Sequence, residues 1–306
     1  MRVQKIHADT VHPICIFLFY VGVIGFTLAC HHPVVVSVSF VCAGLYLISL
    51  KGLRALGRTL RFVLPLMLIV AIANPLFNRR GVTVLFMTWN NNWVTLEALM
   101  FGIVSGIQLA AIILWFASYQ VVMTSDKFLY LFGKIAPSAS LLITMTIRLV
   151  PTLQRQVKQI RTSQQMLNKM PERVLPRMNA AIRHLSTLLS WSMENAVEMA
   201  DSMKARGYGI RRRTTFHLFR FDSRDSVILC LLLLFCGVCG LARTFGHGTM
   251  QFYPRMTLII TGVSGMVMYS TFALMCLLPT FFEMAERLRH RRVFPKGGHS
   301  LGSVRV

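Results

Sequence analysis

Six long apolar runs recur along this chain of 306 residues. About 20 apolar residues in a helix cross the hydrocarbon core of a bilayer, where no water can satisfy an open backbone. Hydrophobic residues make up 54% of the chain and charged residues only 14%, whereas soluble domains carry about 25% charged residues. The sequence therefore predicts an all-α membrane protein with about six transmembrane helices, at approximately 14–30, 33–50, 60–78, 97–120, 226–243 and 257–280.

The 33 Lys and Arg residues, set against 11 acids, are unevenly distributed along the chain. Seventeen lie between residues 120 and 225, four in the loop 51–61, and six beyond residue 282. The positive-inside rule predicts that these regions and the N-terminus lie in the cytoplasm, which requires an even number of crossings between them. The segment 126–153, interrupted by Pro137 and Pro151, is then a partly embedded helix that does not cross.

This topology predicts three parts. Residues 1–125 carry the N-terminal transmembrane helices, 126–225 the partly embedded helix and cytoplasmic helices, and 226–306 a transmembrane hairpin with a basic tail. The first run could instead be a signal peptide, but the next apolar run follows at once, so we expect a helical hairpin and no cleavage. The net charge is +22, but the sequence contains no motif that recognises a groove of DNA or RNA. No nucleic-acid partner is therefore expected.

Two amphipathic helices are expected within the basic region. Their apolar positions alternate at spacings of four and three: Leu153, Val157, Ile160, Gln164 and Leu167 in the first, and Leu185, Leu189, Ser192, Ala196, Met199 and Met203 in the second. A proline-containing linker, 168–178, separates them. Such helices could lie on lipid, pack together or dock a partner. The small and Met-rich second stripe favours packing and docking.

No group of residues in the sequence indicates catalysis, ion transport by ionisable side chains or cofactor binding. Glu97 is the single acid near a membrane core, whereas ion-driven carriers place ionisable groups inside their spans. There is no P-loop, no metal-binding cluster and no candidate catalytic residue. We therefore expect no enzyme activity, metal or cofactor on this chain.

The second amphipathic helix ends at Arg206 and Gly207. Gly suits the left-handed residue beyond a helix end, and cations suit the negative end of the helix dipole. Arg206 also follows Met203 by three residues, so it continues the apolar stripe at the tip. On the residues alone, a helix cap and a docking tip are both open interpretations.

The segment "ADSMKARGYG", followed by "RRRTTF", resembles the Ala-Arg-Gly coupling segment of the transmembrane T component of energy-coupling factor (ECF) transporters. "IRLVPTLQRQVKQI" is similar to the start of that family's first coupling helix; "VTLEALMFGI" and "NPLFN" also fit its pattern. The resemblance implies two cytoplasmic ABC-type ATPase subunits, which hold ATP and Mg, and a small membrane subunit that binds a vitamin or a metal ion. It further implies a multi-pass protein of the prokaryotic cell membrane.

By the same resemblance, Ala205, Arg206 and Gly207 form one coupling tip, preceded by Met199 and Met203, and Arg148 and Pro151 mark the start of the first coupling helix. The other tip follows Gln164 and falls on Met166, Leu167 and Asn168, where the family's arginine is absent. The alternative function is a non-coupled membrane scaffold whose basic cytoplasmic region binds anionic lipid.

Overall fold

The structure, a computed structural model, describes residues 11–78, 81–88, 92–133, 136–167, 174–210, 221–246, 250, 252 and 262–293. The chain forms two compact units: a larger unit of residues 1–124 and 219–306, and a smaller unit of residues 125–218. Each unit is described by itself.

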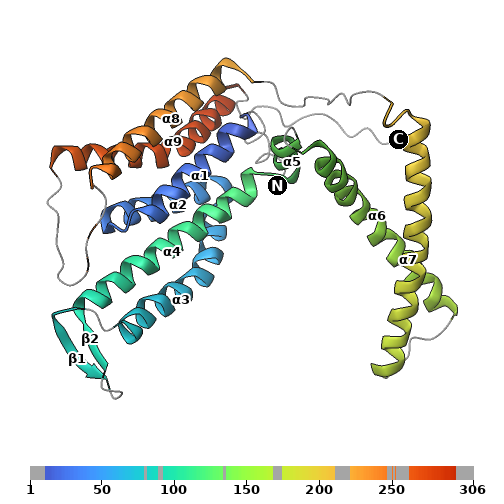
Figure 1. Cartoon of the computed structure of the whole chain (residues 1–306), viewed down its shortest axis with the longest axis horizontal. Helices are drawn as coiled ribbons and strands as arrows, with labels where there is room; N and C mark the ends of the chain where they lie inside the picture. Colours follow the sequence, from blue (N-terminus) through green and yellow to red (C-terminus); the bar gives the residue numbers. More distant parts are fainter. Residues whose placement is uncertain are drawn as a thin grey trace, which may run out of the picture. The chain divides into compact units, whose positions relative to one another are not determined.

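The larger unit consists of long apolar helices that lie side by side (Figure 1). They are α1 (Pro13–Ala29), α2 (Pro33–Lys51), α3 (Leu53–Phe77), α4 (Leu96–Val122), α8 (Ser223–Thr244) and α9 (Val263–Val293). Within the described ranges, five of them are long and apolar enough to cross a membrane, and α1 is a shorter apolar helix. The prediction of an all-helical multi-span membrane protein is confirmed. The predicted run at 257–280 starts on residues outside the described ones.

One small hairpin was not predicted. Strands β1 (Val84–Thr88) and β2 (Asn92–Thr95) pair antiparallel between α3 and α4. The carboxylate of Glu97, the acid that the sequence places at the start of α4, accepts hydrogen bonds from the backbone N–H and hydroxyl of Thr83. Glu97 therefore fixes the hairpin to the helix that follows it.

A His-Pro pair starts each of the first two helices. His12 and His32 are the N-caps, and each ring accepts a hydrogen bond from the backbone N–H two residues on, at 3.3 Å. The proline that follows lacks an N–H, which the first helical position does not need. The pair His31-His32 thus begins the second helix of the hairpin.

Helices α3 and α4 approach closely because α4 carries glycine where they meet. A methyl group added to Gly102 would lie 2.7 Å from the carbonyl oxygen of Ala71, and one on Gly106 would lie 2.9 Å from that of Met67. In lipid, helices gain little from apolar burial against each other, so small residues that admit a neighbouring backbone favour association. Ala98 and Ala110 extend the same stripe at spacings of four and are buried.

Buried hydrogen bonds join α4 to α1 and α2. The hydroxyl of Ser39 lies 2.8 Å from that of Thr27 and accepts from the indole N–H of Trp115 at 3.0 Å. The amide of Gln108 donates to the carbonyl of Thr27 at 2.8 Å. These groups are polar side chains or backbone atoms in an apolar bundle, where an unpaired group is costly. The network therefore fixes the register of three helices.

The last two helices pack on the first two. Asp222 and Asp225 form a capping box at the start of α8. The buried Asp225 carboxylate also accepts from the backbone N–H of His12 at 3.2 Å. One acidic residue thus joins the beginnings of α1 and α8.

The smaller unit contains α5 (Ser125–Gly133), α6 (Pro137–Leu167) and α7 (Val174–Ala205). Neither α5 nor α6 is among the candidate spans found in the described ranges. Helix α6 begins at Pro137 and runs unbroken through Pro151, so the interruption expected at Pro151 is wrong. Helix α7 begins at Val174, inside the segment 168–178 that was predicted to be a linker. Pro176 is tolerated there because N–H groups in the first turn of a helix have no carbonyl partner within the helix.

The glycine contact between α3 and α4 gives a test of this packing. Replacing Gly102 with Ala should destabilise the protein by about 1–3 kcal/mol, because its methyl group meets backbone atoms that cannot turn aside. Thermal unfolding of the purified protein in detergent measures the effect. The matched control is Gly237→Ala in α8, where a methyl group has nothing within 4 Å and helix propensity favours Ala. Equal changes in the two variants would contradict the close α3–α4 contact.

Candidate functional site

The C-terminal end of α7 is closed by a specific backbone motif. The N–H of Tyr208 donates to the carbonyl of Met203 at 3.1 Å, and the N–H of Gly207 donates to that of Lys204 at 2.9 Å. This pair of bonds is the Schellman motif, which needs a left-handed residue directly after the helix. Gly207 has φ +85°, so glycine is required there by the backbone itself.

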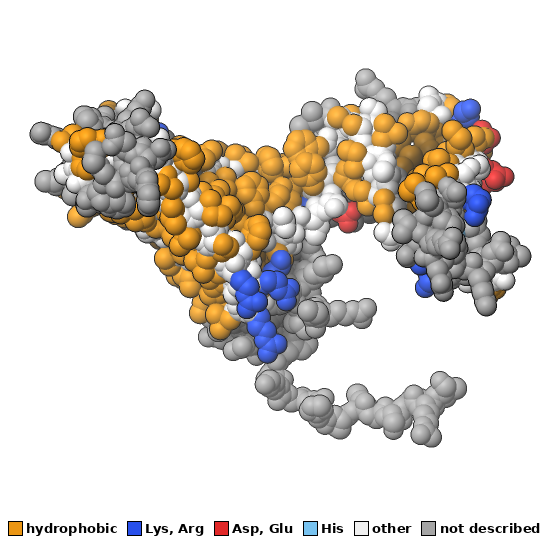
Figure 2. Space-filling view, turned by 90° about the horizontal axis from the view of Figure 1, so that it is seen from below, with side chains coloured by type: hydrophobic (Ala, Val, Ile, Leu, Met, Phe, Trp, Pro, Cys, Tyr) orange, Lys and Arg blue, Asp and Glu red, His pale blue; other side chains and the backbone are white. Residues whose placement is uncertain are grey.

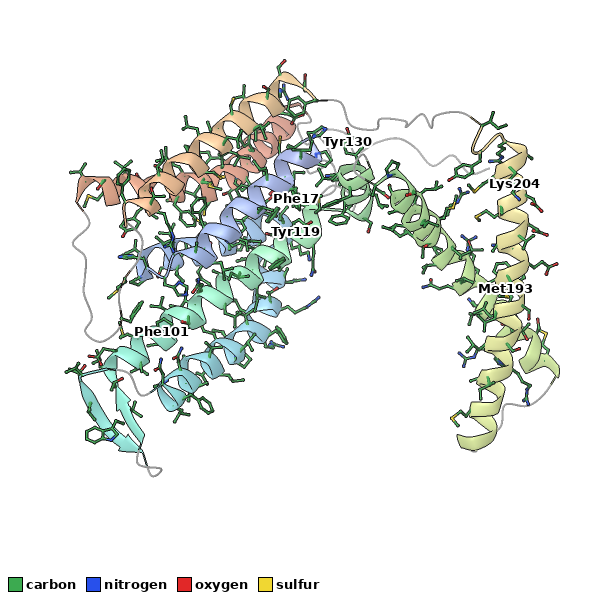
Figure 3. The ribbon with its side chains drawn as sticks, viewed as in Figure 1. Phe17, Phe101, Tyr119, Tyr130, Met193 and Lys204 are labelled. Atoms are coloured by element: carbon green, nitrogen blue, oxygen red, sulfur yellow. The ribbon has the colours of Figure 1, made fainter. Side chains whose placement is uncertain are left out.

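The same motif leaves Arg206 at the tip. Its side chain is exposed and makes no ion pair with any acid in the described part of the chain. Ala205 is also exposed, Met203 is half-buried, and Met199 is 39% exposed. Lys204, labelled in Figure 3, lies in the last turn of the helix. A guanidinium held at a rigid helix end is suited to a bidentate contact with a partner's carboxylate.

Two apolar neighbours of Arg206 were not predicted from the sequence. Tyr208 is 56% exposed and Ile210 is 80% exposed, on either side of Gly209, which has φ +94°. The sequence Gly-Tyr-Gly-Ile could have indicated this. Glycines readily adopt positive φ, so the chain turns at Gly207 and Gly209 and leaves Tyr208 between them and Ile210 after them exposed. The tip therefore offers one cation flanked by an aromatic and an aliphatic side chain, a composition typical of interface centres.

Helices α6 and α7 pack on each other within the smaller unit. The half-buried face of α7 contains His184, Leu188, Trp191 and Asn195, spaced by four, three and four residues. The predicted stripe lies beside this face and is largely uncovered: Leu185 and Leu189 are each 55% exposed. The apolar surface of α7 is thus wider than the pattern indicated, and Leu188 and Trp191 belong to its less exposed part.

The end of α6, predicted as the other tip, lies well apart from the end of α7 (Figure 1). Met166 is 83% exposed in the last turn of α6. Gln164 and Leu167 belong to this helix, but their side chains lie outside the described residues, as does Asn168 altogether. The two predicted tips are therefore separate surfaces and not one composite site.

Arg148 and Pro151, predicted as the start of the first coupling helix, lie in the interior of α6 and are exposed. Pro151 has no N–H to donate to the carbonyl of Ile147, so one hydrogen bond of the helix is missing there. The hydroxyl of Thr152 reaches the carbonyl of Arg148 at 3.5 Å. The residues that the sequence singled out thus lie at a turn of α6 that lacks one backbone hydrogen bond.

No group of three His, Cys, Asp or Glu residues that could hold a metal ion is found within the described ranges. The tip of α7 brings together a cation, an aromatic ring and an aliphatic side chain.

No model of a known protein family matches the chain. It is similar to two proteins named energy-coupling factor transporter transmembrane protein EcfT. The one from Lacticaseibacillus paracasei is 27% identical over 221 residues, which cover 66% of this chain and 81% of that protein. The one from Bacillus selenitireducens is 31% identical over 110 residues, or 35% of this chain and 41% of that protein.

A third similarity is to an uncharacterised protein of Mycoplasma pneumoniae, 35% identical over 102 residues. The match covers 30% of this chain and 22% of that protein. The chain thus spans less than half the length of two of these three relatives, and about four fifths of the other.

The backbone requirement at Gly207 can be tested without any partner. Gly207→Ala should weaken the cap by about 1–2 kcal/mol, because a β-carbon disfavours the left-handed conformation. Amide hydrogen exchange at Tyr208 should then become roughly five- to thirty-fold faster. Gly207→Asn is the control, since Asn tolerates this conformation and should retain most of the protection. Unchanged exchange in the Ala variant would contradict the capping motif.

Proposed function

We propose that this chain, a member of the energy-coupling factor T-component family, is the membrane subunit through which ATP hydrolysis on partner proteins drives uptake of a vitamin or a metal ion. In this proposal two cytoplasmic ABC-type ATPase subunits dock on the smaller unit, and a small membrane subunit captures the substrate. The chain lies in a prokaryotic cell membrane, with α6, α7 and the C-terminus on the cytoplasmic side.

The observation that carries the proposal is the tip of α7. Arg206 is presented at the end of a helix of 32 residues, and the cap at Gly207 holds the chain in one conformation there. A desolvated charge-assisted hydrogen bond contributes about 1.5–3 kcal/mol. A rigid helix with such a contact at its end can pass a displacement from an ATPase to the elements that pack along it.

The uncovered apolar face of α7 supports a further protein contact. Ile182, Leu185, Leu189 and Met193 recur at spacings of three or four residues and are each more than half exposed. Contiguous apolar surface of this kind is unusual in a protein without a partner and marks interaction sites. We assign this face to the substrate-binding membrane subunit, which would then contact the same helix whose tip meets the ATPase.

The two ATPase subunits are expected to be unequal partners. The end of α7 carries Arg206, whereas the corresponding residues at the end of α6 are Met166, Leu167 and Asn168. Met166 is 83% exposed, so an apolar contact replaces the charged one at that end. The ATPase that meets α6 therefore needs an apolar groove, and the ATPase that meets α7 an acidic one.

The chain itself performs no chemistry in this proposal. ATP and Mg are bound by the ATPase subunits, and substrate specificity belongs to the small membrane subunit. Helix α7 can transmit a movement of the ATPase only if its contacts with that ATPase differ between the ATP-bound and ATP-free states. We place that difference at Arg206.

Replacing Arg206 with Ala tests the proposal. The variant should reduce ATP-dependent uptake by about 10- to 150-fold, which corresponds to loss of one desolvated charged contact, while its level in the membrane stays unchanged. Uptake of the substrate and ATP hydrolysis are measured with the purified complex in liposomes.

Lys204→Ala is the matched control, because it removes an exposed cation from the same last turn of α7. It should change uptake less than twofold, since an exposed charge contributes little. Equal losses in the two variants would favour the alternative function, a scaffold that needs only general positive charge.

A further inference from the structure

The start of α3 carries a stripe of positive charge that the proposed function does not use. Arg54, Arg58 and Arg61 are spaced by four and three residues, so they lie on one face of the helix, and Lys51 precedes them at the end of α2. All four side chains are exposed. We refer to these four residues as the basic stripe.

The stripe is held in a fixed orientation by the opposite face of α3. Leu56 and Leu60 are half-buried and Val63 is buried, at spacings of four and three residues. Leu56 lies against α2, since a methyl group on Gly44 would be 4.0 Å from its side chain. Because the apolar face is packed inward, the arginines must face out. Figure 2 shows one cluster of Lys and Arg side chains on a mostly hydrophobic surface, with other basic side chains spread elsewhere in the view.

Nothing in the described part of the chain compensates this charge. None of the four cations makes an ion pair there, and the first turn of α3 has no acid. The cap residue is Gly52, which offers no side chain to the free N–H groups. Cations at a helix N-terminus also oppose the helix dipole. The arrangement is unfavourable for the isolated chain and becomes favourable when an anion lies against it.

We propose that the basic stripe binds the headgroups of anionic phospholipids at the membrane surface. Arg61 is the last charged residue of α3, and its neighbour Phe62 is 69% exposed. Leu53, at the other end of the stripe, is 72% exposed. Apolar side chains beside a row of cations suit the boundary between headgroups and acyl chains.

Lipid is favoured over an acidic protein because of this continuity with the span. The exposed apolar surface of α3 continues from Phe62 through Leu64, Leu68 and Ile69, and in a membrane-spanning helix this surface faces acyl chains. A lipid whose tails lie along that surface brings its phosphate to the level of Arg61 and Arg58. Lipid binding by the basic stripe does not require the partner ATPases. The stripe could therefore fail to bind lipid while the chain still couples to ATPases, or bind lipid in a chain that does not couple.

The test compares lipid affinities of the purified full-length chain after removal of bound lipid. Native mass spectrometry with added phosphatidylglycerol or phosphatidylcholine gives an apparent dissociation constant for each. The wild-type chain should prefer phosphatidylglycerol. The triple variant Arg54→Gln, Arg58→Gln, Arg61→Gln should lose that preference by on the order of 100-fold, since each cation near an anionic surface contributes about fivefold. Replacing the same three residues with Lys should retain it.

The matched control replaces Arg155, Lys158 and Arg161, three exposed cations of α6, with Gln. Its preference for phosphatidylglycerol should equal that of the wild type. An equal loss in this control, or no preference in the wild type, would overturn the proposal. So would a Gln variant of the stripe that keeps its lipid preference but no longer co-purifies with ATPase subunits, because the stripe would then be a protein-docking surface.

Discussion

Close backbone approach along α4 is the constraint on which the larger unit depends. Inside a bilayer, leaving lipid for another helix gains little hydrophobic free energy, so packing must come from shape and from hydrogen bonds. Helix α4 supplies both. Gly102 and Gly106 admit the backbone of α3, while Trp115 and Gln108 donate to groups on α2 and α1. The neighbouring helices are positioned by these few contacts, and α8 and α9 then pack on α1 and α2.

The smaller unit differs from the larger one in that its long helices bury little of their surface. Helices α6 and α7 are long, polar on part of their surface and largely exposed, so their function is expected at their ends and exposed faces. Two glycines with positive φ, Gly207 and Gly209, fix how the chain leaves α7. The cap and the docking tip, which the sequence left as alternatives, are compatible: Gly207 provides the cap, and the cap presents Arg206.

The membrane-spanning helices were predictable from the sequence, whereas the effect of individual prolines and the half-buried face of α7 were not. Runs of about 20 apolar residues identified the spans because burying a backbone in lipid leaves few alternatives to a helix. Interruptions were expected at both Pro137 and Pro151 because proline was taken to stop a helix. Pro137 starts α6, whereas Pro151 is tolerated within it. The half-buried face of α7 was missed because the spacing was counted from Leu185 and Leu189, and because His184 and Asn195 on that face are polar.

Crosslinking from the tip of α7 shows whether this tip contacts an ATPase, as we propose. A photoreactive benzoylphenylalanine at position 208 replaces one exposed aromatic ring with another, and position 183, also exposed on α7, serves as the reference. After illumination of native membranes, crosslinked proteins are identified by mass spectrometry. We expect an ABC-type ATPase subunit to be crosslinked from position 208 and not from position 183. Crosslinks from position 208 to lipid alone would contradict this proposal.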